Sequence, residues 1–543
     1  MSESPYLSSP WLQHYDFWVP NEVRKPRGPL YQILQIASSQ YTSRPATHFL
    51  GAELTFWDIK VRVDRLAEAL HRRGIGKGDR VGIMLPNCPQ YPIAFFAITR
   101  LLAIVVNVNP IYTAPELQRV VEDSGMRALI TLDSLLPTVR AASAHSIELL
   151  IITNLDEYSI ALQHAASEPG CTTLSSLLQE EEETILPMLP GDCSDEVAVL
   201  TYTGGTTGVP KGAMLTHGSI YVNMLQSVLW GSYFTRRGEE RILLVLPLFH
   251  VYGMTVGMLL SFWNGTMMIL LSKYNVEQLL DAIEHLRPTF LPGVPTLFQS
   301  ILNHPRAPSC GLQFVRAFNS GAAPLAVEVI TRFERLAGAL LREGFGMTEL
   351  SCSAITTPQM AIRKPGSVGI PMPSTLARIV DMETGTKEMP VGEEGELLVR
   401  GPQVMKGYWN KPEETAIALR DGWLHTGDIA RMDQDGFFYI VQRKKDMIIV
   451  GGFKVFPNEV DEVLYQHPAV AEAAAIGIPH SYRGEVVKAF VALRHGYEVS
   501  AEDLIAFCRE RLAKFKVPVE VEFLDALPKS AVGKILRRSL REK

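Results

Sequence analysis

The chain is organised around one stretch, Leu200-Thr201-Tyr202-Thr203-Gly204-Gly205-Thr206-Thr207-Gly208-Val209-Pro210-Lys211-Gly212. Its glycines let backbone N–H groups turn toward a common point, its threonine hydroxyls add donors, and its lysine adds a positive charge, a combination that suits phosphate oxygens. It is not a Walker loop, because Gly212 follows Lys211 where a Ser or Thr would bind Mg²⁺. The sequence therefore predicts a phosphate-binding loop followed by a helix that begins at Thr216; the alternative is a flexible surface turn.

Composition indicates an ordinary globular protein of several domains. The 543 residues are 47% hydrophobic and 20% charged, and 52 basic against 58 acidic residues give a net charge of −6. This balance gives no reason to expect a polyanionic partner, and no basic block carries interleaved aromatics, so we expect no nucleic-acid binding. The six cysteines lack metal-ligand or redox spacing, and the N-terminus shows no signal peptide, which predicts a reduced intracellular protein without a zinc site.

The segment 242–272 contains no charged residue and is long enough to resemble a membrane span. Proline, histidine, asparagine and glycine interrupt it, so a buried unit fits better: a strand at 242–246, a helix around 254–263 and a strand at 267–271.

Strands and helices alternate along most of the chain. Helices are expected at 30–40, 55–73, 91–102 and 114–124, and strands at 81–85, 104–107, 128–131 and 149–152. Such alternation predicts parallel or mixed sheets covered by helices. Short alternating runs between Gly/Pro turns predict a small β-subdomain over 366–408.

A charged run, residues 442–446, separates this region from a tail that reads as α+β, with helices at 457–466 and 501–512 and strands at 470–476 and 487–491. The expected fold is therefore α/β. A large N-terminal domain of mixed sheets with a small β-subdomain (1–443) is joined by a hinge to a smaller α+β C-terminal domain (446–543).

Four further clusters could carry chemistry. The stretch 343–349 sets Phe345 between glycines, where it could cover a planar ligand, and ends in Glu349, a potential Mg²⁺ ligand. Asp428 follows a glycine and could accept two hydrogen bonds from a ribose. The pair 451–452 would permit close passage of a ligand, and Lys534 lies in a Pro/Ser/Gly-containing segment that could enter a site. Taken singly, each is also compatible with a turn or a solvated tail. His250, among apolar residues, is by itself better explained as a core histidine.

Together, and in this order, the clusters resemble those of the acyl-adenylate-forming superfamily, which contains acyl-CoA synthetases, peptide-synthetase adenylation domains and beetle luciferases. The resemblance covers nearly the whole chain. The runs 421–429 and 443–446 resemble the fatty-acyl-CoA synthetase signature, and 203–208, 401–405 and 527–530 look most like bacterial long-chain enzymes. Gly204, Phe345 and Gln442 depart from the usual Ser, Tyr and Asp or Gly, and none of these removes a group that the chemistry requires.

The resemblance implies activation of a fatty acid by ATP and Mg²⁺ to acyl-AMP, then transfer to coenzyme A. Lys534 and His250 would be catalytic, and Glu349 and Thr203 would hold the metal. Tyr252 and Trp230 would bind the acyl group, with Gly321 and Gly346 nearby. The implied nucleotide- and CoA-binding residues are Thr203, Gly204, Gly205, Thr206, Thr207, Gly208, Lys211, Gly321, Ala322, Ala323, Glu343, Gly344, Phe345, Gly346, Met347, Thr348, Asp428, Arg443, Lys445, Gly451 and Gly452.

Alternatives stay open at this point. An aryl-CoA ligase of the 4-coumarate type would use the same two steps, although Ile449 stands where plant aryl-CoA ligases carry lysine. An amino-acid-activating domain is disfavoured because 250–252 lacks an aspartate to pair an ammonium. A non-catalytic nucleotide-binding or membrane-associated protein is a third class. We expect a cytoplasmic enzyme with small-molecule partners, and the sequence is compatible with a homodimer and with loose association at the inner face of the membrane.

Overall fold

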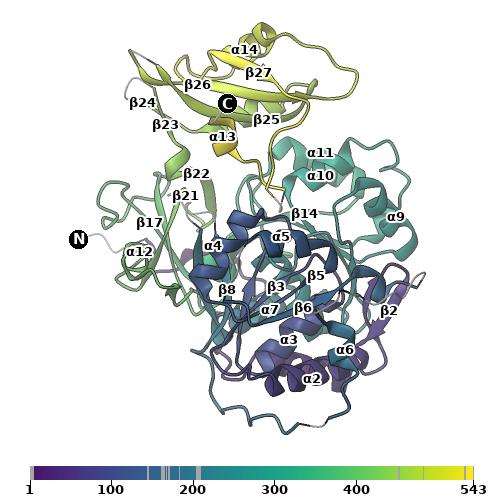
Figure 1. Cartoon of the computed structure of the whole chain (residues 1–543). Helices are drawn as coiled ribbons and strands as arrows, with labels where there is room; N and C mark the ends of the chain where they lie inside the picture. The colour runs from purple at the N-terminus through teal and green to yellow at the C-terminus, as the bar shows by residue number, and fades with distance from the viewer. Residues whose placement is uncertain are drawn as a thin grey trace.

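The computed structural model describes residues 5–142, 146–160, 166, 168, 171–182, 184–203, 210–450, 453–480, 482–530 and 533–541. Within these residues the N-terminal part contains two large mixed sheets covered by helices (Figure 1). One has nine strands in the order β16-β15-β14-β13-β12-β10-β11-β1-β2, and the other has eight in the order β19-β9-β8-β4-β3-β5-β6-β7. Most neighbouring strands pair in parallel, for example β12 with β13 and β3 with β4, whereas β8 pairs antiparallel with β9. The expected α/β class is confirmed.

The bounds of these strands place the loops that matter for function. The nine-stranded sheet consists of β1 (Pro45–Phe49), β2 (Ala52–Thr55), β10 (Arg241–Leu244), β11 (Met267–Leu270), β12 (Phe290–Gly293), β13 (Ala317–Ser320), β14 (Leu341–Met347), β15 (Cys352–Thr356) and β16 (Ile370–Pro371). The eight-stranded sheet consists of β3 (Arg80–Met84), β4 (Ile104–Asn107), β5 (Ala128–Leu132), β6 (Leu149–Thr153), β7 (Thr172–Thr173), β8 (Val197–Thr203), β9 (Lys211–Thr216) and β19 (Gly407–Tyr408). The main helices that cover them are α1 (Tyr31–Gln40), α2 (Phe56–Arg72), α3 (Gln90–Arg100), α4 (Ala114–Ser124), α7 (His217–Gly231), α9 (Val276–Leu286), α10 (Pro295–Leu302) and α11 (Val327–Ala337).

Helix α2 shows why the local predictions succeed. Thr55 Oγ1 accepts from the Asp58 N–H at 3.0 Å, and Asp58 Oδ2 accepts from the Thr55 N–H at 2.9 Å, a complete capping box. Such a cap contributes about 1 kcal/mol. Ile59, Val63 and Leu66 recur at helical spacing and are fully buried, so the buried face and the start of the helix are both written in the local sequence. Helix α7 likewise begins after Thr216, as expected.

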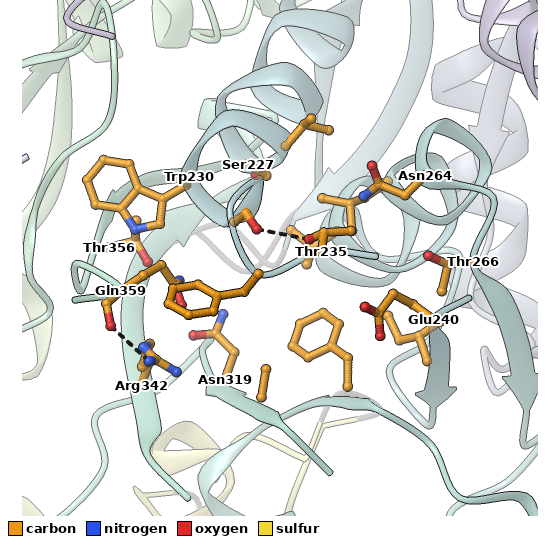
Figure 2. Close-up of a pocket in the computed structure, with 18 of the residues that line it drawn as sticks. Ser227, Trp230, Thr235, Glu240, Asn264, Thr266, Asn319, Arg342, Thr356 and Gln359 are labelled. Carbon is orange, nitrogen blue, oxygen red and sulfur yellow. Dashed lines mark hydrogen bonds between the residues drawn. The ribbon is translucent and has the colours of Figure 1, made fainter. Parts of the chain in front are cut away.

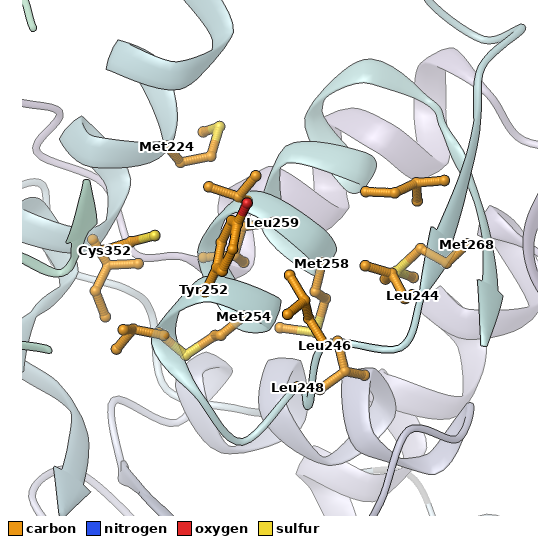
Figure 3. Packing of buried hydrophobic residues seen from close by; sticks show 14 of the residues in the cluster. Met224, Leu244, Leu246, Leu248, Tyr252, Met254, Met258, Leu259, Met268 and Cys352 are labelled. Carbon is orange, nitrogen blue, oxygen red and sulfur yellow. The ribbon is translucent and has the colours of Figure 1, made fainter. Parts of the chain in front are cut away.

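The uncharged segment folds as a buried unit of the core. Strands β10 and β11 pair in parallel, and a π-helix (Tyr252–Leu259) continues into α8 (Leu260–Asn264) between them. The sequence predicted the β-α-β unit but not the π-helical turn. Met254, Met258 and Leu259 on this turn pack among buried residues of both sheet and helices (Figure 3). Among the described residues, no helix is both long and apolar enough to cross a membrane.

A third sheet contains β17 (Leu376–Val380), β18 (Gly395–Arg400), β20 (Leu419–Arg420), β21 (Trp423–Met432) and β22 (Phe438–Arg443), with α12 (Pro412–Ala418) beside it. The predicted bounds of the β-subdomain, 366–408, are therefore wrong at both ends. Strand β16 joins the nine-stranded sheet and β19 the eight-stranded sheet, because such two-residue edge strands are fixed by long-range pairing that leaves no local pattern.

Residues from Ile448 onward form a sheet and a core of their own. The strands are β23 (Ile448–Val450), β24 (Phe453–Val455), β25 (Val470–His480), β26 (Gly484–Leu493) and β27 (Glu520–Phe523), and the helices are α13 (Pro457–Tyr465), α14 (Ala501–Arg509) and α15 (Arg537–Arg541). Figure 1 shows this part stacked on the N-terminal part, with the yellow segment after β27 reaching down toward β14.

Candidate active site

The base of the predicted phosphate loop is a β-hairpin. Thr203 ends β8 and pairs with Lys211, the first residue of β9, so the two flanks of the loop lie side by side. The loop itself, with Gly204, Gly205, Thr206, Thr207 and Gly208, lies outside the described residues. Lys211 Nζ lies 5.3 Å from the centroid of the Tyr408 ring, a cation–π contact that positions the ammonium.

Glu349 lies beside this hairpin, in a 3-10 turn that directly follows β14. Its carboxylate is buried and accepts a hydrogen bond from the Tyr408 hydroxyl at 2.8 Å. Burial and the Glu349 charge raise the pKa of Tyr408, so the phenol remains a donor. A buried carboxylate is the kind of hard oxygen ligand that Mg²⁺ prefers, so Glu349 fits the predicted metal. Sequence reasoning missed Tyr408, although the run Gly407-Tyr408-Trp409 is a local aromatic signal.

Asp428 and Arg443 face each other on neighbouring strands, β21 and β22. Arg443 Nε lies 2.7 Å from Asp428 Oδ1, while Asp428 Oδ2 is buried and has no hydrogen-bond partner among the described residues. Burial raises the pKa of Asp428, and the Arg443 charge opposes that rise. A buried acceptor without a donor costs stability, so Oδ2 is a place where a ligand hydroxyl would be stabilised.

Lys534 reaches the same place from the C-terminal part. Its side chain is partly buried, and burial together with the charges of Arg443 and Arg537 lowers its pKa to about 8, while Asp428 and Asp446 oppose the shift. Its segment is tied to the N-terminal part, because Thr296 Oγ1 donates to the carbonyl of Gly533 at 3.0 Å.

A second tie is formed by α13, where the Asn458 side-chain amide donates to the carbonyl of Val441 at 2.9 Å. Lys445 lies exposed in the turn 444–446 between the two parts, and its charge is among those that oppose the rise in the pKa of Asp428. Gly451 and Gly452 lie outside the described residues.

The loop after β13 forms a narrow slot against Tyr252. A Cβ at Gly321 would lie 3.0 Å from Cε1 of the Tyr252 ring, and Ala322 has a φ of 69°, so the chain turns sharply where it meets the ring. Tyr252 is buried and its hydroxyl donates to the carbonyl of Asn319 at 3.2 Å. Ala323 follows in the same turn.

His250 is held as a neutral imidazole. Its Nδ1 accepts from the Tyr252 N–H at 3.3 Å, which leaves the ring proton on Nε2. Burial, with the positive charge of Lys534, lowers the pKa of His250 to about 4. The structure therefore joins His250 to the predicted site, where the residue type alone favoured a core role.

Strand β14 carries the remaining predicted residues, Glu343, Gly344, Phe345, Gly346 and Met347, with Thr348 starting the next turn. Gly346 passes so close to β15 that a Cβ would lie 1.7 Å from the Cys352 carbonyl oxygen. Phe345 is buried, and burial raises the pKa of Glu343 to about 8, so this carboxyl is largely protonated at neutral pH.

Behind this cluster lies a cavity of about 320 Å³. Trp230 lines it and donates from Nε1 to the Thr357 carbonyl at 3.0 Å, which fixes the indole. Figure 2 shows Ser227, Trp230 and Thr235 on one side of the cavity and Asn319 and Arg342 on the other. Several apolar side chains complete the lining, among them Val256, Leu260, Phe290 and Met372.

A second cavity of about 610 Å³ lies where the two parts of the chain meet. Phe249, the neighbour of His250, lines it together with Val294, Thr296 and Gly533. It therefore extends from the protein surface to the segment that carries Lys534. The family resemblance placed Trp230 at the acyl group, and it does line the first cavity. The remaining walls of both cavities have no local signal in the sequence, because they come from elements far apart in the chain.

Known proteins resemble this chain in sequence and in fold. The chain is 43% identical to a long-chain-fatty-acid–CoA ligase of Bacillus subtilis and 38% identical to one of Salmonella typhimurium, each match covering 98% of both chains. Among solved structures, the anthranilate CoA ligase AuaEII in complex with anthranoyl-AMP has a TM-score of 0.86 at 26% identity, over 96% of this chain and 98% of that one.

ATP-bound MatB from Rhodopseudomonas palustris has a TM-score of 0.84 at 30% identity, over 94% of this chain and 98% of that one. The apo form of MatB has a TM-score of 0.76 at 30% identity, over 95% of this chain and 99% of that one. The family model of the AMP-binding enzyme matches residues 34–409, and that of the AMP-binding enzyme C-terminal domain matches residues 459–534. The predicted resemblance is thereby confirmed, and the chain belongs to the AMP-binding enzyme family.

Proposed function

We propose that this protein is a long-chain fatty acid–CoA ligase that forms acyl-AMP from the acid and ATP and then passes the acyl group to coenzyme A. The observation that carries the proposal is one polar cleft. In it the Lys534 amine, the orphan Asp428 oxygen and the Glu349 carboxylate converge beside the hairpin Thr203–Lys211, with an apolar cavity directly behind.

In the first step, a carboxylate oxygen of the acid attacks the α-phosphorus of ATP, and the bond to the bridging oxygen breaks to release pyrophosphate. Lys211 and the loop that it ends would hold the β- and γ-phosphates, and Glu349 with Thr203 would hold Mg²⁺, which offsets the phosphate charge. Asp428 Oδ2 would accept from the ribose hydroxyls. Lys534 would lie between the carboxylate and the α-phosphate, where a positive charge stabilises the oxygens of the transition state.

The adenine would enter the slot formed by residues 321–323 and 343–348. Phe345 and Tyr252 offer aromatic surface there, and Gly321, Gly344 and Gly346 allow the backbone to approach a planar ring. The chain superposes better on ATP-bound MatB than on apo MatB, which supports assigning the arrangement described here to the adenylate-forming state.

In the second step, the thiol sulfur of CoA bonds to the acyl carbon, the bond to the AMP oxygen breaks, and the thiol proton is lost. We propose that the unit 446–543 turns relative to 1–443 about Lys445 and Asp446, withdraws Lys534 and brings Gly451 and Gly452 to the pantetheine arm. The 610 Å³ cavity supports this route, because Phe249, the neighbour of His250, lines it where the two parts of the chain meet. The neutral His250 imidazole would line the path without adding a charge.

The acyl chain would occupy the 320 Å³ cavity, with Trp230 in its wall and Tyr252 near the reacting carboxylate. Its size lies within the range of small-molecule sites, and its apolar lining suits an alkyl chain. The names of the two bacterial relatives support a long-chain acid. An aryl-CoA ligase is the second candidate, because the anthranilate CoA ligase shares the fold with a TM-score of 0.86.

The test is AMP formation with ATP, Mg²⁺ and CoA, comparing octanoate, palmitate, oleate and 4-coumarate. We expect palmitate or oleate to give the highest kcat/KM, and a preference for 4-coumarate would move the assignment to the second candidate. No AMP formation with any acid would contradict the proposal.

The homodimer stays a prediction that sedimentation velocity would test.

A further inference from the structure

One charged side chain in the wall of the acyl cavity has no counterion. Arg316 and Glu240, which also line the cavity, form an ion pair with each other. Arg342 forms no ion pair with any described residue, and its buried Nε has no hydrogen-bond partner among them. Only its Nη2 is engaged, since it donates to the carbonyl of Gln359 at 3.1 Å (Figure 2). A partly buried cation with unused donors costs stability, so the packing of a plain alkyl chain does not account for Arg342.

The carboxylates that act on Arg342 are already engaged elsewhere. Asp16 accepts from the backbone N–H groups of residues 359–361 at 2.7 to 2.9 Å. Glu334 forms a two-point ion pair with Arg363, in which Nη2 lies 2.9 Å from Oε2. Burial and the charge of Arg363 lower the pKa of Arg342, and the two carboxylates oppose this shift. A guanidinium nevertheless stays protonated at neutral pH, so the positive charge at the cavity wall is left for a ligand to neutralise.

The guanidinium is held in a fixed place. The Gln359 carbonyl that accepts from it belongs to the loop that Asp16 clamps. On the sheet, Arg342 of β14 pairs directly with Asn319 of β13, and both side chains line the cavity. The Asn319 side-chain amide in turn donates to the Tyr252 hydroxyl at 3.2 Å. These contacts orient the donors of Arg342 before any substrate binds, which lowers the entropy cost of using them.

Arg342 and Asn319 lie part-way along the cavity. Asn319 precedes Gly321, in the slot proposed for adenine, by two residues, and Ala317, which also lines the cavity, precedes Asn319 by two more. A strand rises about 3.3 Å per residue, so each of these steps covers about 7 Å. A group bound by Arg342 would therefore be separated from the reacting carboxylate by several methylenes, with further cavity beyond it.

We propose that Arg342 is a specificity-determining residue that binds a second oxygen group of the acid, a carboxylate or a hydroxyl carried part-way along the acyl chain. Guanidinium donors form strong hydrogen bonds to such oxygens. An oxygenated chain supplies the acceptor that Arg342 lacks, whereas a plain chain leaves the cation without a partner, and a site of this kind discriminates against the plain analogue. The inference rests on the proposed function and adds its substrate class: hydroxy acids or dicarboxylic acids.

The experiment measures AMP formation with matched pairs of acids, decanedioate with decanoate and 10-hydroxystearate with stearate. We expect the oxygenated member of at least one pair to have a kcat/KM about tenfold higher, and that pair identifies the oxygen group. Arg342→Met should lower the ratio of oxygenated to plain acid about tenfold to hundredfold, and should raise kcat/KM for the plain acid because the wall becomes apolar. Arg342→Lys keeps the charge and should retain part of the ratio. The control is Arg119→Met, an exposed arginine of α4 that does not line the cavity.

A wild type that prefers the plain acid in both pairs, or a ratio that Arg342→Met leaves unchanged, would overturn the inference, while activity on palmitate would still support the proposed function. Absence of AMP formation with every acid would instead reject the proposed function. Isothermal titration calorimetry with decanedioate and 10-hydroxystearate then decides on the subsite by itself. Binding that is about tenfold weaker in Arg342→Met than in Arg119→Met would support it, and equal binding by these two variants would overturn it.

Discussion

The charge of Lys534 predicts how the two half-reactions respond to pH. Burial and the neighbouring arginines lower the pKa of this amine to about 8. The lowered value means that the ammonium is lost as pH rises through 8, well below the range of an exposed lysine. Between pH 7 and pH 9 the protonated fraction falls about tenfold, and with it the charge that stabilises the adenylation transition state. The kcat/KM of acyl-AMP formation should therefore fall about tenfold over this interval.

Thioester formation from supplied acyl-AMP should respond in the opposite direction. It does not need Lys534, and the CoA thiolate grows as pH approaches the thiol pKa of about 8.5. The assay measures ATP–pyrophosphate exchange for the first half-reaction and thioester release for the second, each across pH 6 to 10. Lys534→Ala should lower the first rate by about 10² to 10³, the cost of removing one transition-state charge contact, and leave the second within about twofold.

The neighbours of Lys534 test the cause of the shift. Arg443→Gln removes the larger charge that repels the Lys534 ammonium, so the fall of kcat/KM for acyl-AMP formation (the descending limb of its pH profile) should move to higher pH. Asp428→Asn removes a charge that attracts the ammonium, so the same limb should move to lower pH. Both changes act on nucleotide binding as well, so the position of the limb is the readout and not the absolute rate. A limb that stays fixed in both variants, a first half-reaction that is flat to pH 10, or an equal loss of both half-reactions in Lys534→Ala would refute the reasoning.

Three further outcomes follow from single residues. Asp428→Asn should raise the KM for ATP by about tenfold or more, since it weakens a buried acceptor aimed at the ribose; an unchanged KM in initial-rate kinetics would contradict this role. Trp230→Ala enlarges the acyl cavity and should shift the kcat/KM ratio of oleate to octanoate upward, whereas Trp57→Ala, on a ring that is 53% exposed, should not. Gly346→Ala would bring a Cβ within 1.7 Å of a carbonyl oxygen and should lower the free energy of unfolding by about 3 kcal/mol or more. Gly191→Ala is the control in thermal unfolding, because a Cβ at Gly191 would meet no atom within 4 Å. Equal Tm values for the two variants would show that β15 moves aside without loss of stability.

Local sequence was enough for much of the fold. Strand β4 and helix α4 have the predicted bounds, and α2 begins one residue after its capping threonine, because caps and apolar spacing act within a few residues. The type and order of the chemical groups were also readable: a glycine-threonine loop with a lysine, a carboxylate after an aromatic turn, and a lysine near the C-terminus. These groups match the family in which the chain is now placed.

The tertiary structure alone decided how those groups meet. Tyr408 pairs with β9 and holds Glu349, and Lys534 arrives beside Asp428 through contacts between two separate cores. Both cavities are likewise lined by segments that are distant in the chain. Residue types and helix starts depend on neighbours a few positions away, so the sequence determines them. Whether the site residues come together depends on how the sheets and domains pack. The burial that results lowers the pKa of Lys534 and leaves one oxygen of Asp428 without a hydrogen-bond donor among the described residues.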